Sequence, residues 1–158
     1  LQVVGVPNEG TNNYALWVDS TGASRFDGEV FSVPWTDYYS SSTIVGWGSL
    51  TAGRRQIMYR TLGDMVFVSF YLEGTSNSTD LTFTLPYTSV TIATSHNFTS
   101  ALGFTYDNGV YLAVGYLSLQ NNDNVVKCMT SASSAGTDKG WTASGSKIVA
   151  GDFWYMRA

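Results

Sequence analysis

The segment at residues 63–86 constrains the fold more than any other part of the chain. In residues 65–73 every second side chain is apolar, and the side chains between them are mixed. The apolar set is Val66, Val68, Phe70 and Leu72. A Gly/Ser/Asn turn cluster separates this stretch from a second predicted strand at residues 81–85. A strand with one apolar face and one partly apolar face is typical of a sandwich or barrel that also meets a neighbouring surface.

The rest of the chain repeats short strand patterns that are separated by turn residues. Clusters of Asn, Asp and Gly at residues 62–64, 107–109 and 121–123 are hairpin signals, because these residue types tolerate positive φ. No sustained helical period is present, so we expect very little helix. The pattern predicts an all-β fold, an antiparallel β-sandwich or jelly roll. Further strands are predicted at residues 44–50, 56–61, 90–94, 101–106, 110–119, 124–131 and 147–156.

The composition supports a folded β-protein and argues against several other classes. Aromatic residues make up 15% of the chain and charged residues only 13%, which excludes disorder and a long-helix protein. The net charge is −4, and the few Lys and Arg form no basic stripe, so we expect no nucleic-acid partner. No apolar run is long enough to cross a membrane. The single Cys128 is predicted to be a buried structural thiol.

Two predicted strands are apolar on both faces for much of their length. They lie at residues 110–119 and 148–156. In a monomeric sandwich the outer face of a sheet should be polar. The two-sided pattern therefore predicts that another subunit covers one of the sheets.

Two segments resemble patterns from one class of viral protein. Residues 63–86 combine a hydrophobic strand, Gly-Thr-Ser-Asn-Ser and a Thr/Phe strand ending in Leu-Pro, and this is similar to the C-terminal heads of bacteriophage tail fibres and tailspikes. Residues 13–30 resemble shaft segments that precede such heads, and the final strand at residues 153–157 shares the resemblance to these fibre proteins more loosely. The predicted architecture is also similar to the jelly-roll heads of the C1q and tumour-necrosis-factor kind, which form trimers through one sheet.

This resemblance implies a homotrimeric virion protein that acts outside the cell and binds a host cell-surface carbohydrate. It also implies a fragment of a longer fibre, with a short N-terminal β-shaft and linker at residues 1–34 and a β-sandwich head at residues 35–158. An isolated hairpin within residues 1–33 could not bury its own apolar side chains. Three chains around one axis would bury them, and the alternative is a hairpin folded onto its own domain.

Residues suited to catalysis are sparse. His96 is the single histidine, and no Gly-x-Ser-x-Gly elbow accompanies it, which argues against a Ser-His-Asp triad. One His and one Cys cannot form a His/Cys metal site. No Gly-rich loop of the phosphate-binding type is present. We therefore expect no cofactor and no enzymatic activity.

The acidic residues fall mostly in predicted turns. Glu73 is predicted at a solvated strand edge, and Asp152 is predicted to be buried against Arg157 or Arg54. A calcium site of loop oxygens is left open at residues 107–108 or 121–124, although the spaced acids of a recognised calcium loop are missing.

Sugar binding is the chemistry that the loops favour. Aromatic rings stack on the C–H faces of sugars, and Asn, Asp and Ser meet the hydroxyls. The candidate ligand-binding residues are Trp35, Tyr38, Tyr39, His96, Tyr106, Asp107, Asn108 and Trp141. For each aromatic the alternative is packing in the core or between subunits, and Trp47 and Trp154 are predicted to pack in that way. The competing function is a structural trimerisation cap that binds no ligand, while an enzyme would need a cleft with two converging acids.

Overall fold

The computed structural model describes residues 33–91, 98–112, 115–130 and 140–158. The contacts divide the chain between Ser32 and Val33 into two units, and the described residues all belong to the second unit, Val33–Ala158. The predicted shaft at residues 1–34 therefore lies almost wholly outside the described residues. No helix in the described ranges is long and apolar enough to cross a membrane.

The described part of the chain is all-β, with one short 3-10 turn and no α-helix, as the sequence predicts. Two antiparallel sheets are present, with strand orders β1-β3-β4-β11-β7-β8 and β2-β5-β10-β9-β6. The elements are β1 (Thr36–Asp37), η1 (Tyr39–Ser41), β2 (Ile44–Val45), β3 (Trp47–Leu62), β4 (Met65–Ser76), β5 (Leu81–Thr84), β6 (Phe98–Ala101), β7 (Phe104–Asp107), β8 (Val110–Tyr111), β9 (Gly115–Leu119), β10 (Val125–Thr130) and β11 (Gly145–Met156).

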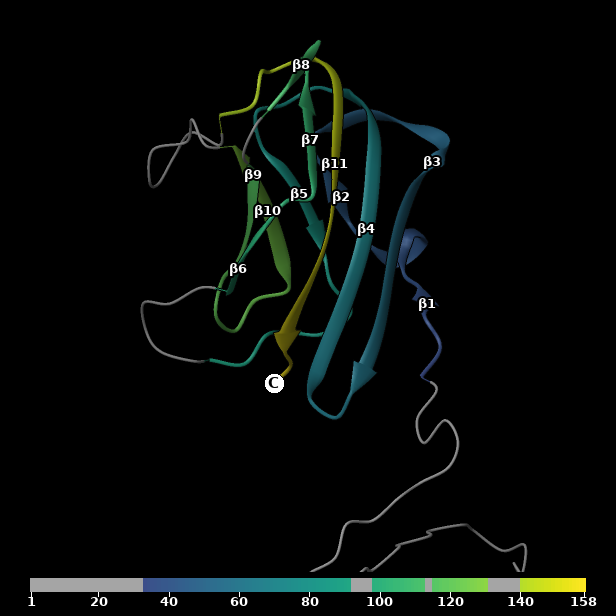
Figure 1. Cartoon of the computed structure of the whole chain (residues 1–158), viewed down its shortest axis with the longest axis vertical. Helices are drawn as coiled ribbons and strands as arrows, with labels where there is room; N and C mark the ends of the chain where they lie inside the picture. The colour runs from purple at the N-terminus through teal and green to yellow at the C-terminus, as the bar shows by residue number, and fades with distance from the viewer. Residues whose placement is uncertain (1–32, 92–97, 113–114, 131–139) are drawn as a thin grey trace, which may run out of the picture. The chain divides into compact units, whose positions relative to one another are not determined.

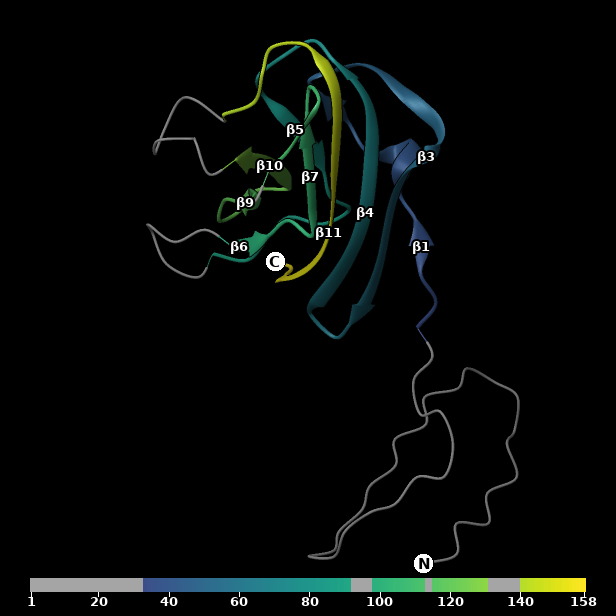
Figure 2. The same ribbon diagram turned by 45° about the horizontal axis from the view of Figure 1, so that its top comes forward.

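The two sheets face each other as the layers of a sandwich, with β3, β4 and β11 in one layer and β5, β10 and β9 in the other (Figures 1 and 2). The alternation predicted for β4 is confirmed, because its apolar set is buried between the layers. The same core holds side chains from β5, β9, β10 and β11. Its fully buried members include Val66, Val68, Leu72, Phe83, Leu117, Leu119, Val126, Val149 and Tyr155.

The strand pairs are nested along the chain. β4 pairs with β11, β5 with β10, β6 with β9, and β7 with β8, and every pair is antiparallel. The first and last strands of this series therefore meet, and each inner pair lies within the outer one. The ladder between β4 and β11 is the longest without a register shift, from Met65 opposite Met156 to Ser76 opposite Gly145.

One long hairpin belongs to both sheets. Phe98 pairs with Leu119 in the five-stranded sheet, and Asp107 pairs with Val110 in the six-stranded sheet, in the same continuous register. The Leu102 amide donates to the Gly115 carbonyl at 2.9 Å across the point where the hairpin passes between the layers. The prediction of a single strand at residues 110–119 is therefore wrong, since β8 and β9 are separate strands that lie in different sheets.

Other predicted boundaries also shift. The separate strands predicted at 44–50 and 56–61 are largely one strand, β3, which changes register against β4 between Leu50 and Arg55. The strand predicted at 101–106 is divided between β6 and β7. Of the strand predicted at 90–94, only residues 90 and 91 are described, and neither lies in a named strand.

The three predicted turns are confirmed. Gly63 joins β3 to β4 with φ of 58°, and Asn122 lies between β9 and β10 with φ of 54°. Asn108 and Gly109 have φ of 47° and 95°, the two successive positive values that a tight hairpin turn requires.

Gly74 on β4 lies opposite the part of β3 where the register shifts, and the close approach of the two backbones there can be tested by mutation. A Cβ on Gly74 would collide with the Ser49 carbonyl oxygen, whereas a Cβ on Gly48 would lie 3.6 Å from its nearest neighbour, the Thr75 oxygen. We expect Gly74→Ala to lower the free energy of unfolding by about 1–3 kcal/mol. The control Gly48→Ala should change it by less than about 0.5 kcal/mol. Urea denaturation measures both values, and equal stability of the two variants would contradict the close approach at Gly74.

Candidate functional site

The outer face of the six-stranded sheet carries aromatic and methionine side chains in cross-strand rows. One row joins Leu62, Met65 and Met156, and the next joins Arg60, Phe67 and Trp154. A more polar row of Met58, Ser69 and Asp152 follows. Beyond it lie the row Gln56, Tyr71, Ala150 and Phe104, and the row Glu73, Ile148, Tyr106 and Tyr111.

The outer face of the five-stranded sheet differs in character. One row across its five strands joins Val45, Thr82, Lys127, Ser118 and Thr99, and a second row joins Met129, Tyr116 and Ala101. The first row is mostly polar, although its Ser118 is buried, and the second is largely apolar, so this face is mixed. Most of the exposed large apolar side chains in the described residues nevertheless belong to the six-stranded sheet: Leu62, Phe104, Val110, Tyr111, Trp154 and Met156, against Val45 on the five-stranded sheet. The six-stranded sheet is therefore the more favourable surface for an apolar partner.

The first two rows form the proximal patch, which comprises Leu62, Met65, Phe67, Trp154 and Met156. Trp154 is 54% exposed, so a large apolar surface is open to solvent. The proximal patch lies at the end where the described chain begins, because β1 pairs Thr36 with Tyr59 and runs antiparallel to β3. The Arg60 guanidinium lies 4.9 Å from the centre of the Trp35 ring and 5.5 Å from that of Phe67, so it joins Trp35 to this patch.

The distal patch, Phe104, Tyr106, Tyr111 and Ile148, lies at the opposite end of the same face. Figure 1 places β8 at the top of the sandwich and β1 toward the bottom. The Tyr111 ring meets Tyr106 and Phe104 in edge-to-face contacts, with centroid separations of 5.1 and 5.5 Å. Tyr111 is nevertheless 71% exposed, which leaves a flat aromatic surface in contact with water.

A polar groove lies on the same half of the sheet. It has a volume of about 400 Å³ and is lined by Gly53, Arg54, Arg55, Gln56 and Tyr71. Arg54 Nη1 donates to both oxygens of Glu73, at 2.9 and 3.2 Å. The Tyr71 hydroxyl donates to the same carboxylate at 2.8 Å. The groove therefore contains fixed cationic and hydroxyl groups beside aromatic rings.

The electrostatics join the groove to the distal patch. The hydrogen bond to Glu73 and the burial of the ring raise the pKa of Tyr71 above its ordinary value, and the Tyr111 phenol adds to the same shift. Arg55 pairs with the inner-facing Leu72, so its side chain leaves the opposite face of β3, where its guanidinium lies 5.0 Å from the centre of the Tyr39 ring. Tyr39, a predicted ligand residue, thus lies on the other face of β3 from the groove, and Tyr106 lies on the outer face beyond Ile148. The sequence analysis did not select the residues that line the groove.

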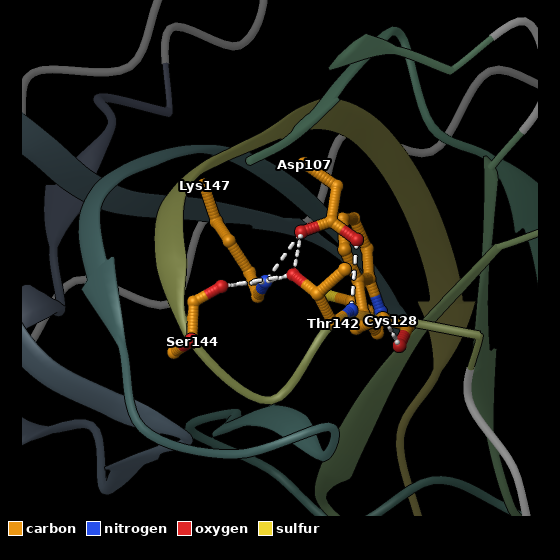
Figure 3. Close-up of polar contacts among 6 residues, drawn as sticks. Asp107, Cys128, Thr142, Ser144 and Lys147 are labelled. Atoms are coloured by element: carbon orange, nitrogen blue, oxygen red, sulfur yellow. Dashed lines mark hydrogen bonds and ion pairs between the residues drawn. The ribbon is translucent and has the colours of Figure 1, made fainter. Parts of the chain in front are cut away.

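Asp107 is part of a buried cluster on the inner side of the sheet (Figure 3). Its carboxylate accepts hydrogen bonds from the Lys147 ammonium, the Thr142 hydroxyl and the Thr142 amide. Lys147 also donates to Thr142 Oγ1 at 2.8 Å and to the Ser144 carbonyl at 3.4 Å. These bonds fasten the segment before β11 to β7, so the role of Asp107 is structural and its carboxylate is not available to a sugar.

Trp141 is also buried, with 3% of its surface exposed. Its indole N–H donates to the Cys128 carbonyl at 2.8 Å, and the Lys147 ammonium lies 5.9 Å from the centre of its ring. The expectation that Trp141 faces solvent in a loop is therefore wrong. The ring packs into the core because its polar group finds a backbone acceptor on β10.

The three aromatics of the first predicted loop lie apart from the distal patch. Trp35 is exposed beneath Arg60, at the proximal end. Tyr38 is half-buried, and its hydroxyl donates to the Leu85 carbonyl at 3.3 Å. Tyr39 is half-buried beneath Arg55. The predicted sugar site is thus divided between two ends of the sheet.

Two further predicted ligand residues have different outcomes. Asn108 is exposed in the β7–β8 turn, where its backbone N–H donates to the Ser146 carbonyl at 2.7 Å. His96 lies outside the described residues.

Two acidic residues differ from their predicted environments, and the single thiol agrees with its prediction. Asp152 is exposed on β11, so the expectation of a buried pair is wrong, and Arg157 lies instead 3.8 Å from Asp64. Glu73 lies within β4, paired and largely buried, rather than at a solvated edge. Cys128 is buried, as predicted, and burial raises the pKa of its thiol to about 12.

In both loops where a calcium site was left open, the carboxylate already accepts hydrogen bonds. The Asp107 carboxylate is held by Lys147 and Thr142, and Asp123 Oδ1 accepts from the amides of Asn124 and Val125 at 2.7 and 3.1 Å. In the described ranges no group of three or more His, Cys, Asp or Glu side chains could hold a metal ion.

The groove residues had a signal in the sequence. Arg54-Arg55 is the one adjacent pair of cations in a chain with few charges, and it follows a glycine. Glu73 has the same parity as Tyr71 in the β4 alternation, which places both on the outer face. The pairing of Tyr111 with Tyr106 required the turn register and could be read from Asn108-Gly109.

Comparison with known protein families, curated proteins and solved structures finds no match for the chain.

The buried ion pair of Asp107 and Lys147 predicts that the stability of the fold depends on pH. Burial alone would raise the pKa of Asp107, but the bonds from Lys147 and Thr142 outweigh it and hold the pKa below its ordinary value. The stabilisation is therefore complete above about pH 4, the ordinary carboxyl range, and is lost as pH falls through the folded-state pKa. Asp107→Asn leaves Lys147 buried without its counter-ion and should cost roughly 3–5 kcal/mol at pH 7.

A double variant separates this effect from other acids. Asp107→Asn with Lys147→Met removes both charges, so its free energy of unfolding should fall less than that of the wild type between about pH 5 and pH 2.5. Denaturant titrations at both pH values measure the difference. An identical fall in the two proteins would show that Asp107 does not carry the acid sensitivity.

Proposed function

We propose that this chain is the homotrimeric head of a bacteriophage tail fibre or tailspike, part of a longer virion protein that attaches to a host cell-surface carbohydrate without catalysis. The observation that carries the proposal is the aromatic outer face of the six-stranded sheet, with Trp154 54% and Tyr111 71% exposed. A chain that leaves such a surface open in one copy has partners for it. The sequence patterns at residues 63–86 and 13–30 support the same assignment.

The nested strand pairs favour a jelly-roll of the C1q and tumour-necrosis-factor kind. A jelly roll is a long antiparallel pair wound up on itself, so first pairs with last and each following strand pairs inward. The pairs β4 with β11 and β5 with β10 lie in opposite sheets and follow that rule. The innermost strands depart from it, because the β6–β9 and β7–β8 pairs form one hairpin that is shared between the sheets.

The proximal patch is the surface that we assign to the trimer. Three chains that leave a common shaft must lie close together where they enter their heads, and the described chain begins beside this patch. Its side chains are apolar or aromatic, and its nearest cation is engaged with aromatic rings. Burying it against two further copies removes apolar surface from water at little electrostatic cost.

The distal patch and the groove support binding of a carbohydrate. Aromatic rings, the Arg54 guanidinium, a carboxylate and a phenol meet there, which are groups that hold sugar rings and hydroxyls. This surface lies at the far end of the sheet from the beginning of the described chain, as expected for the part of a fibre that meets a cell.

A structural trimerisation cap is the second candidate. The burial of Trp141 and Asp107 favours it, because two of the predicted ligand residues stabilise the fold instead. A cap needs the proximal patch and makes no use of the exposed groove. The two functions therefore differ in whether the distal half of the face binds anything.

Self-assembly is tested by mass in solution. Light scattering should give about three times the chain mass of 17.2 kDa. Trp154→Lys with Met156→Lys places charges in the proximal patch and should give the single-chain mass, because desolvating unpaired charges in an interface is costly. Thr82→Lys, on the opposite sheet, should remain trimeric. A wild-type monomer at micromolar concentration would contradict the trimer, and dissociation of Thr82→Lys would place the interface on the other face.

The absence of catalysis is tested with the same protein. We expect no release of reducing ends from bacterial polysaccharides, since hydrolysis of a glycoside needs two facing carboxyl groups. Glu73 is the acid beside the groove and is held by Arg54 and Tyr71. Hydrolysis that Glu73→Gln abolishes without unfolding the chain would overturn the non-catalytic assignment.

A further inference from the structure

The groove lies where β3 bulges against β4. The register of the two strands shifts between Leu50 and Arg55, so that residues 51–54 of β3 oppose the single residue Glu73 of β4. A bulge interrupts the ladder and leaves its extra residues without a partner on the facing strand. The lining of the groove includes Gly53, from within the bulge. Backbone groups of the bulge are therefore present at the groove together with side chains.

The charged side chains at the groove balance each other. Arg55 pairs with the inner-facing Leu72 and directs its side chain to the other face of β3, where it meets Tyr39. Of the described lining residues, Arg54 thus presents the one cationic side chain, and its Nη1 donates to both oxygens of Glu73. A ligand in the groove meets one cation and one anion that are already paired.

This pair keeps hydrogen-bonding capacity for a ligand. The Arg54 side chain is 63% exposed, and only its Nη1 is used by Glu73, so N–H groups of the guanidinium remain as donors. The Tyr71 hydroxyl spends its proton on Glu73 at 2.8 Å, so its oxygen remains an acceptor. The Gln56 amide, which is exposed, both donates and accepts. Donors and acceptors without net charge match sugar hydroxyls, each of which also donates and accepts.

Aromatic rings adjoin these polar groups. In the cross-strand row of Gln56, Tyr71, Ala150 and Phe104, the small Ala150 separates the two rings. The Tyr111 ring contacts Phe104 with a centroid separation of 5.5 Å, and its phenol is close enough to Tyr71 to affect its titration. Since Tyr111 is 71% exposed, its ring offers a surface on which the C–H face of a pyranose can stack.

We propose that the groove binds an uncharged pyranose unit of a surface glycan, with its hydroxyls on Arg54, Gln56 and the Tyr71 oxygen and its ring face on Tyr111. The inference rests on the proposed attachment function and names its ligand class. A volume of about 400 Å³ suits one or two sugar residues at the site, with the rest of the glycan outside it.

The paired charges separate this ligand from charged sugars. A sugar carboxylate gains a strong bond only by taking Arg54 from Glu73, and Glu73, with 14% of its side chain exposed, then loses its counter-ion. Leaving a largely buried charge unpaired is costly. A sugar ammonium faces the guanidinium of Arg54, while both oxygens of Glu73 are already engaged. A neutral hydroxyl leaves the ion pair intact.

The experiment is a binding titration of the purified oligomer on matched glycans. The panel contains neutral oligosaccharides of glucose, galactose and mannose, the same oligosaccharides oxidised to carboxylates at C6, and the same oligosaccharides with amino groups at C2. We expect the neutral members to bind at least roughly tenfold more tightly than both charged forms. Their affinity should change by less than about twofold between about 0.05 and 0.5 M salt. Tighter binding of either charged form, or a steep loss of neutral binding with salt, would overturn the proposal.

Variants locate the site. Arg54→Gln and Tyr111→Ala should each lower affinity for the neutral glycans by roughly tenfold. Arg55→Gln is the matched control, because it removes the neighbouring cation from the other face of β3, and it should leave affinity within about twofold. Unchanged binding in both Arg54→Gln and Tyr111→Ala, at unchanged mass and melting temperature, would exclude this groove.

A charge variant tests the basis of the selectivity. Glu73→Gln leaves Arg54 as an unpaired cation, so the affinity for carboxylated glycans relative to neutral ones should rise by at least roughly tenfold. The double variant Arg54→Gln with Glu73→Gln removes both charges and should show no such rise. A merely structural role of Glu73 would leave the ratio unchanged in the single variant, and that result would contradict selection by the ion pair.

The outcomes also separate the ligand class from the head function. If the trimer prefers charged glycans, or binds neutral ones independently of the groove, the attachment head stands and the neutral-sugar site falls. If a verified trimer binds no member of the panel, both fall and the structural cap remains. If Arg54→Gln loses its trimeric mass, the groove is part of the subunit interface and the ligand site is excluded.

Discussion

The ladder between β4 and β11 runs without a register shift along the whole of both strands. Because successive side chains point to opposite faces, this register sends Val66, Val68 and Phe153 into the core and Phe67 and Trp154 to the outer surface. A slip of one residue in either strand would exchange that strand's two sets. The core and the exposed aromatic face are therefore two consequences of one pairing.

The distal end of the ladder illustrates how this sandwich treats a buried charge. Lys147 is an inner-facing residue of β11, at a depth where an apolar side chain would normally lie. Its ammonium is accommodated because Asp107, Thr142 and the Ser144 carbonyl all converge on it. Such a cluster contributes little net stability, but removing one partner is costly. It fixes the position of the β7–β8 turn, and so the position of the distal patch next to it.

The parts of the fold that were predictable from sequence rest on local signals. The alternation in β4 and the turns at Gly63, Asn108 and Asn122 are set by neighbouring residues, and these predictions were correct. The burial of Trp141 could not be read in the same way, because its partner is the carbonyl of Cys128 on a different strand. Asp107 is buried because of Lys147, which lies 40 residues further along the chain.

Residues 110–119 show a second limit of prediction from sequence, because they contribute strands to both sheets. The pairing register is the same in the part of the hairpin that lies in each sheet, so the alternation of side chains contains no sign of the crossing. Asp152 shows the opposite case, because its position on the outer face follows from the alternation of β11. It shares its parity with Ile148 and Trp154, so the outer face was its expected position.

Cys128 gives this molecule an internal reporter of its own opening. The chain has a single thiol, and that thiol lies in the core with a pKa of about 12, so it is almost entirely protonated and out of reach of reagents at neutral pH. Alkylation can then proceed only while β10 separates from its neighbours. The rate at which a thiol reagent labels the folded protein is consequently a direct readout of how often the sandwich comes apart.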